Sequence, residues 1–118
     1  NVKQLILPGN QIADDGLEAL ADSPYLKNLE LLNANHNEIG DDGAIAIANT
    51  EKLPNLKDLS MFGNVIGDRG AQALADSPQS KKYTKLDLYK NQYTRAGYKA
   101  LTESENLKNC EELEIYRE

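Results

Sequence analysis

A unit of 27 residues recurs along the chain without a single insertion or deletion. The segment Leu56 to Gly70 shows the unit most clearly, and its leucines, asparagine, glycines and alanines return at equivalent places in the other units. One such column is Leu5, Leu32, Leu59, Leu86 and Leu113. Because a unit this short cannot bury its own apolar face, the repetition predicts an array in which each unit packs on the next.

Each unit carries a strand pattern followed by a helix pattern. In the first unit, Val2, Leu5 and Leu7 give the alternation that is typical of a strand with one buried face. The stretch 16–21 that follows predicts a short helix, and Asp14 precedes it as an expected helix cap. The next two units repeat this arrangement, with Asp41 before residues 44–48 and Asp68 before residues 71–75.

The recurring residues, written LxxLxLxxNxIGDxGAxALA, resemble the leucine-rich repeat family, most closely the type found in ribonuclease inhibitor and in the GALA repeats of bacterial effectors. The resemblance implies a curved α/β solenoid with a parallel sheet on its concave face and helices on its convex face. It also implies a protein that binds other macromolecules. In this family the asparagine after each strand satisfies backbone groups of the turn, which implies a structural role for Asn10, Asn37, Asn64 and Asn91.

We expect a single solenoid across residues 1–118, composed of four full repeats and a fifth strand. The repeats begin near residues 2, 29, 56, 83 and 110. Terminal repeats of solenoids normally carry a polar cap, and neither end of this chain has a distinctive one. The chain is therefore interpreted as a piece of a longer protein or as one whose ends meet another chain; the alternative is that its few terminal residues suffice as caps.

The third and fourth units depart from the pattern. Ser80 stands where the other units carry a leucine, so the segment 77–82 is expected to lack a buried anchor and to form the loosest loop. In the fourth unit, Tyr83 and Tyr93 replace aliphatic residues and Arg95 replaces the capping aspartate. Such drift marks either the approach to the end of an array or a change of functional surface.

The outward positions of the strands define the predicted binding surface, because successive strand residues point to opposite faces of a sheet. Phe62, Tyr89 and Tyr116 share one outward column and should form a continuous aromatic stripe. Aromatic residues are common anchors of protein interfaces, although here they could also serve only to cover the sheet. The predicted partner-binding residues are Leu31, Asn33, Asn35, Asp58, Phe62, Asp87, Tyr89, Glu114 and Tyr116.

The charge of the chain bears on the kind of partner. Nineteen acidic and 13 basic residues give a net charge of −6, which argues against nucleic acid. Asp58, Asp87, Glu112 and Glu114 make the predicted surface acidic, so we expect a protein partner with a basic or mixed apolar surface. We expect no membrane, small-molecule substrate, metal or cofactor.

One cysteine, Cys110, lies in an apolar column and is expected to be buried in the core. A lone cysteine makes no disulfide, and the sequence shows neither a signal peptide nor an Asn-x-Ser/Thr sequon. These features favour a cytoplasmic location.

Catalysis is not expected. His36 is the only histidine, and the one hydroxyl near it in the columns, Ser60, does not lie on the strained turn that exposes a nucleophile. The aspartate pairs at 14–15 and 41–42 lack the spacing of a calcium loop and fit helix capping better.

Three alternative functions stay open. Some proteins of the type that this chain resembles activate GTPases, and others are substrate receptors of ubiquitin ligases. Arg69 and Arg95 lie in the loops where an activator could project an arginine towards a nucleotide. The chain could also be a structural spacer between other domains.

Overall fold

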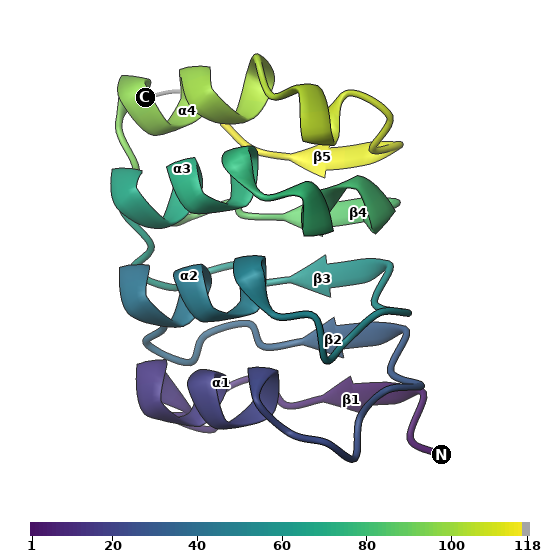
Figure 1. Cartoon of the computed structure of the whole chain (residues 1–118). Coiled ribbons are helices and arrows are strands. Elements are labelled where there is room, and N and C mark those ends of the chain that lie inside the picture. Colours follow the sequence, from purple (N-terminus) through teal and green to yellow (C-terminus); the bar gives the residue numbers. More distant parts are fainter. Residues whose placement is uncertain (117–118) are drawn as a thin grey trace.

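The computed structural model describes residues 1–116 and confirms the predicted α/β solenoid (Figure 1). Figure 1 shows the strands in one layer and the helices in a second layer, with each strand-and-helix unit lying on the one before it. The strands are β1 (Gln4–Ile6), β2 (Leu31–Asn33), β3 (Asp58–Ser60), β4 (Lys85–Asp87) and β5 (Glu112–Glu114). The helices are α1 (Ala13–Ala21), α2 (Asp41–Asn49), α3 (Asp68–Asp76) and α4 (Arg95–Thr102), with the 3-10 helices η1 (Pro78–Lys82) and η2 (Glu105–Leu107).

The five strands form one parallel sheet in the order of the chain. Each strand residue pairs with the residue one repeat later, so that Leu5, Leu32 and Leu59 lie side by side. The middle residue of each strand points towards the helices, and the two residues that flank it point away. None of the helices within residues 1–116 has the length and hydrophobicity of a membrane span.

The core lies between the sheet and the helices and is densest in the central repeats. Leu32, Leu59 and Leu86 are fully buried there. In the first unit, Val2 remains 44% exposed. Cys110 beside β5 is only half-buried, so the expectation of a buried core cysteine is wrong. Its burial depends on a neighbouring repeat, and within the described residues it has one on one side only.

The aspartates of the repeat cap the helix of the next repeat instead of their own. Asp14 lies inside the first turn of α1, and its Oδ1 accepts hydrogen bonds from the backbone N–H groups of Gly40 at 2.7 Å and Gly43 at 2.9 Å, where α2 begins. Asp41 Oδ1 accepts the same two bonds from the N–H groups of Gly67 and Gly70. Asp68 Oδ1 accepts them from Thr94 and Gly97. The expected capping therefore occurs, but it joins two repeats, because each helix starts earlier than its sequence pattern indicates.

Hydroxyl side chains join the other ends of the helices. Thr50, Ser77 and Ser104 each donate a hydrogen bond to a backbone carbonyl near the end of the helix in the preceding repeat, at 2.5 Å in all three cases. Their acceptors are Ala21, Ala48 and Ala75. The ends of α1, α2 and α3 thus each have a carbonyl satisfied by the following repeat, where the last turn has no intrahelical donor.

The asparagines of the central repeats are buried in the turns after the strands. Asn64 is 4% exposed; its Oδ1 accepts from the N–H groups of Asn37 and Ile39, and its Nδ2 donates to the carbonyls of Ala34 and Met61. Asn37 and Asn91 make equivalent bonds to the preceding repeat. Asn10 differs, because it is exposed and its side chain donates only to Pro8 of its own repeat.

The segment that contains Ser80 does not lack a buried anchor, contrary to the sequence-based expectation. Pro78–Lys82 forms the helix η1, and Ser80 is 1% exposed with its hydroxyl bonded to the Leu74 carbonyl at 2.7 Å. A serine can stand in the leucine column because the carbonyl of Leu74, in α3, lies within hydrogen-bond distance of its hydroxyl. Beside it, Tyr83 fills its leucine position, but its buried hydroxyl has no hydrogen-bond partner.

Candidate functional site

The outward residues of the five strands form a surface that we call the sheet face. In register across it lie Asn33, Ser60, Asp87 and Glu114, beside a second row of Leu31, Asp58, Lys85 and Glu112. These residues are half-buried in β2, β3 and β4, and exposed in β5. All the strand residues that the sequence predicts for partner binding therefore belong to the sheet face.

Three aromatic side chains line the edge where the strands end, and we call Phe62, Tyr89 and Tyr116 the aromatic row. The Phe62 and Tyr89 rings are parallel within 9°, with centroids 6.4 Å apart. The Tyr89 and Tyr116 centroids lie 4.6 Å apart at an angle of 50°. These spacings bring three successive repeats into one continuous aromatic contact.

Short polar side chains hold the backbone beneath the aromatic row. Asn35 Oδ1 accepts hydrogen bonds from the Phe62 N–H at 2.8 Å and from the Ser60 hydroxyl at 2.7 Å. Asp87 Oδ1 accepts from the Tyr89 N–H at 3.0 Å. Asn35 is therefore engaged within the protein, whereas the second oxygen of Asp87 remains available.

A depression of about 330 Å³ opens on the sheet face between the aromatic row and β5. Its lining consists of Phe62, Asp87, Tyr89 and Glu114, and we call it the sheet-face depression. All four residues belong to the set predicted from the sequence. The depression combines two aromatic rings with two carboxylates, a composition suited to a cation or to a basic side chain.

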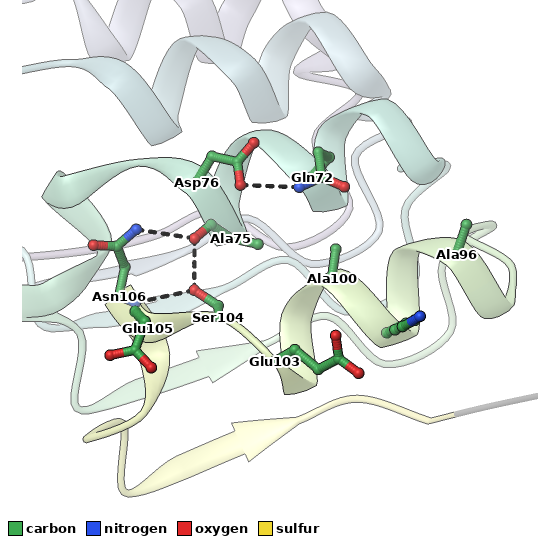
Figure 2. Close-up of a pocket in the computed structure, with 10 residues that line it drawn as sticks. Gln72, Ala75, Asp76, Ala96, Ala100, Glu103, Ser104, Glu105 and Asn106 are labelled. Carbon is green, nitrogen blue, oxygen red and sulfur yellow. Dashed lines mark hydrogen bonds between the residues drawn. The ribbon is translucent and has the colours of Figure 1, made fainter.

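A larger depression, of about 560 Å³, lies between α3, α4 and η2 on the helix side (Figure 2). Figure 2 shows that some of its polar groups bond to one another: Asn106 and Ser104 both donate to the Ala75 carbonyl, and Gln72 donates to Asp76. Its apolar lining comes from small alanine side chains. Lys99 and Glu103 also line it. Because the larger depression offers a ligand no aromatic surface, the sheet-face depression, with its two rings and two carboxylates, is the better candidate site.

Comparisons with known proteins assign the chain to a family. A family model described as "Leucine Rich repeat" matches residues 1–21, 25–48 and 52–75, more than half of the chain. The chain belongs to the leucine-rich repeat family. No curated protein gives a significant match, whereas 27 chains of solved structures match this leucine-rich repeat protein.

One of these structures is named "Leiomodin-1 Actin-Binding Site 2 (ABS2)". It has 19% sequence identity to this leucine-rich repeat chain and a TM-score of 0.77, and the match covers 98% of this chain and 71% of the leiomodin chain. The similarity establishes a shared fold. The family matches end within the third repeat, and the fourth repeat is the one in which the sequence drifts.

His36 and Ser60 do not form the hydrogen-bonded pair of base and nucleophile that a hydrolase would need. The Ser60 hydroxyl donates to Asn35, and the exposed His36 ring meets Phe62 edge-on with centroids 5.2 Å apart. Gly63 has a positive φ of 73°, and a Cβ on it would clash with the His36 ring. The imidazole therefore occupies the space beside the glycine backbone and extends the aromatic surface to the turn after β2.

The other predicted chemical features lie away from the sheet face. Arg69, in the first turn of α3, has one guanidinium nitrogen 3.8 Å from the Asp42 carboxylate, and both side chains are largely exposed. Arg95 is exposed at the start of α4. Among residues 1–116, no three His, Cys, Asp or Glu side chains come together as a metal site would require.

Tyr93 supports the aromatic row, although the sequence did not predict it as a site residue. Its ring lies 6.2 Å from the Tyr116 ring, and its hydroxyl accepts a hydrogen bond from the Tyr116 N–H at 3.2 Å. Burial raises the pKa of the Tyr93 phenol above its ordinary value; the hydrogen bond from the Tyr116 N–H opposes this rise, and the charge of nearby Asp87 adds to it. The only sequence signal for this role is that an aromatic residue stands in an isoleucine column.

Proposed function

We propose that this chain is a non-catalytic protein-binding module that contacts its partner through the sheet face, with the aromatic row as the centre of the contact. One observation carries the proposal: the sheet-face depression is lined by two rings of the aromatic row and by two carboxylates, and all four residues are among those that the repeat pattern predicts for binding. Membership of the leucine-rich repeat family supports a binding role.

The surface chemistry favours a protein partner with a basic and partly apolar surface. Tyr89 is 39% exposed, so its ring can lose solvent contact on binding without any rearrangement of the core. Aromatic residues of this kind dominate the binding energy of protein interfaces. The acidic residues beside the row, Asp58, Asp87, Glu112 and Glu114, would accelerate association with a basic surface and make it sensitive to salt.

The test compares capture of partners by three forms of the chain. The Phe62/Tyr89/Tyr116 triple-alanine variant should lose the proteins that the original chain retains from a lysate of its source. Tyr25→Ala is the matched control, because Tyr25 is 85% exposed and lies between α1 and β2, outside the aromatic row. Equal retention by all three forms would contradict binding through the sheet face, provided that circular dichroism shows each form to be folded.

Purified actin is the first defined probe, because the leiomodin structure that shares this fold carries an actin-binding name. Sedimentation with filamentous actin and binding to monomeric actin can both be measured with the same three forms. Binding that depends on the aromatic row would identify the partner class. If actin does not bind, the partner from the lysate is identified by mass spectrometry.

A further inference from the structure

We propose that the sheet-face depression receives the guanidinium group of an arginine side chain from the protein partner. This inference rests on the proposed function and specifies the chemistry of its central contact. Three features carry it: parallel aromatic rings, a pair of adjacent carboxylates, and the absence of a cation bound to that pair within residues 1–116.

The aromatic rings provide flat faces of the right orientation. Phe62 and Tyr89 are parallel within 9°, and both line the depression. A planar guanidinium stacks on such a face through cation–π attraction and loses little hydration when it does so. An ammonium group can use the attraction but not the planar stacking.

The carboxylates of Asp87 and Glu114 are neighbours on adjacent strands. They are register partners in β4 and β5, which places their Cα atoms about 5 Å apart. Like charges directly opposite each other destabilise a sheet, so a bound cation would relieve a repulsion that the free protein carries. Asp87 Oδ1 is occupied by the Tyr89 N–H, which leaves one Asp87 oxygen and both Glu114 oxygens for a ligand.

Within residues 1–116, no basic side chain forms an ion pair with Asp87 or Glu114. The ion pairs among residues 1–116 join Lys52 to Asp22, Arg69 to Asp42 and Lys108 to Glu105. Lys85 is the basic residue of β4 on the same face, but its register partners are Asp58 and Glu112. A forked donor from outside can bridge two carboxylates, which is the geometry that arginine offers and lysine does not.

The direct test is an NMR titration of the isotope-labelled chain with Nα-acetyl-arginine amide. The amide signals of Phe62, Tyr89 and Glu114 should shift and saturate at millimolar concentration. Nα-acetyl-citrulline amide has the same shape without the charge and should bind at least about tenfold more weakly. Equal binding of citrulline, equal binding of the corresponding lysine amide, or no shift at these residues would overturn the assignment.

Two pairs of substitutions localise the effect. The variant Asp87→Asn with Glu114→Gln should lose at least about tenfold in affinity for the arginine amide. It should stay folded, because Asn33 occupies the position of Asp87 in β2 and its Oδ1 already accepts the equivalent backbone bond, from Asn35 at 3.0 Å. Asp15→Asn with Glu18→Gln is the matched control, because it makes the same charge change at exposed positions of α1 and should bind like the original chain.

The same variants separate this inference from the proposed function. If a partner is lost by the triple-alanine variant of the aromatic row but kept at full affinity by Asp87→Asn with Glu114→Gln, the sheet face binds protein and the arginine contact is wrong. If the partner is kept by both, the proposed function itself fails. Loss in both, together with arginine-amide binding that depends on the carboxylates, supports the two proposals jointly.

Discussion

The turns after the strands and the sheet face share the same 27-residue register, yet they use it in opposite ways. In the turns, one residue type returns in each repeat, as Asn37, Asn64 and Asn91 do, and its side chain is buried and bonded to the preceding repeat. On the sheet face the residue type changes from strand to strand, and the side chains are half-buried or exposed. Repetition marks the positions that hold the stack together, and variation marks those left free for recognition.

The sharpest way to test this contrast is to substitute one asparagine of the turns. Asn64→Ala should lower the free energy of unfolding by about 3 kcal/mol, because two backbone N–H groups and two carbonyls lose their partner in a buried site. Urea unfolding followed by circular dichroism measures the loss. Asn10→Ala is the matched control and should cost less than about 0.5 kcal/mol, because Asn10 is exposed. Equal costs at the two sites would show that bonding between repeats does not explain the column.

The capping aspartates should show a smaller effect of the same kind. Asp41→Ala should cost about 1–2 kcal/mol, because the N–H groups of Gly67 and Gly70 at the start of α3 lose their acceptor. Asp15→Ala, at an exposed position of α1, should be nearly neutral. Hydrogen exchange of the first turn of α3 locates the effect, and protection lost only in the first turn of α2 would contradict capping across repeats.

Substitutions in the aromatic row should reverse the pattern, with an effect on binding and little on stability. Phe62→Ala and Tyr89→Ala should each weaken partner binding by about 1 kcal/mol or more, as expected of interface anchors. Isothermal titration with the captured partner measures this change, and the melting temperature serves as the control. Unchanged affinity in both variants would remove the aromatic row from the binding site.

Tyr83 is the core residue whose buried side-chain hydroxyl lacks a hydrogen-bond partner among residues 1–116. Tyr83→Phe should raise the free energy of unfolding by up to about 1 kcal/mol at neutral pH, because it removes a buried hydroxyl that has no partner. Burial also raises the pKa of the Tyr83 phenol above its ordinary value of 10.0. The raised pKa therefore contributes its full stability to the folded state below pH 10.0. This contribution is lost as the pH rises above 10.0, because the phenol of the unfolded chain then gives up its proton more easily than that of the folded chain.

The corresponding measurement is the melting temperature of both forms as a function of pH. The original chain should lose stability more steeply than Tyr83→Phe from about pH 10 upwards, with the two curves parallel below it. Lys82 and Tyr93 also have shifted pKa values, but they are present in both forms and cancel in the comparison. Parallel curves above pH 10 would mean that the Tyr83 hydroxyl is not buried as described.

The sequence by itself determined the solenoid, the order and register of the strands, and the columns that face the core or the solvent. It could do so because each unit contributes one strand to the sheet and a fixed period aligns every column with its neighbour, as Leu32 and Leu59 show. The same register selected the four residues that line the sheet-face depression. Their role in binding is still a prediction.

Only the tertiary structure decided which repeat each side chain serves. Asp14 caps α2 instead of α1, and Ser80 replaces a leucine because its buried hydroxyl reaches the Leu74 carbonyl of α3. Asn10 and Cys110 are less buried than their columns indicate. In each case the outcome depends on atoms of an adjacent repeat or turn and on how closely they approach. A sequence column fixes the direction of a side chain, but its hydrogen-bond partners and its burial are properties of the packed neighbour.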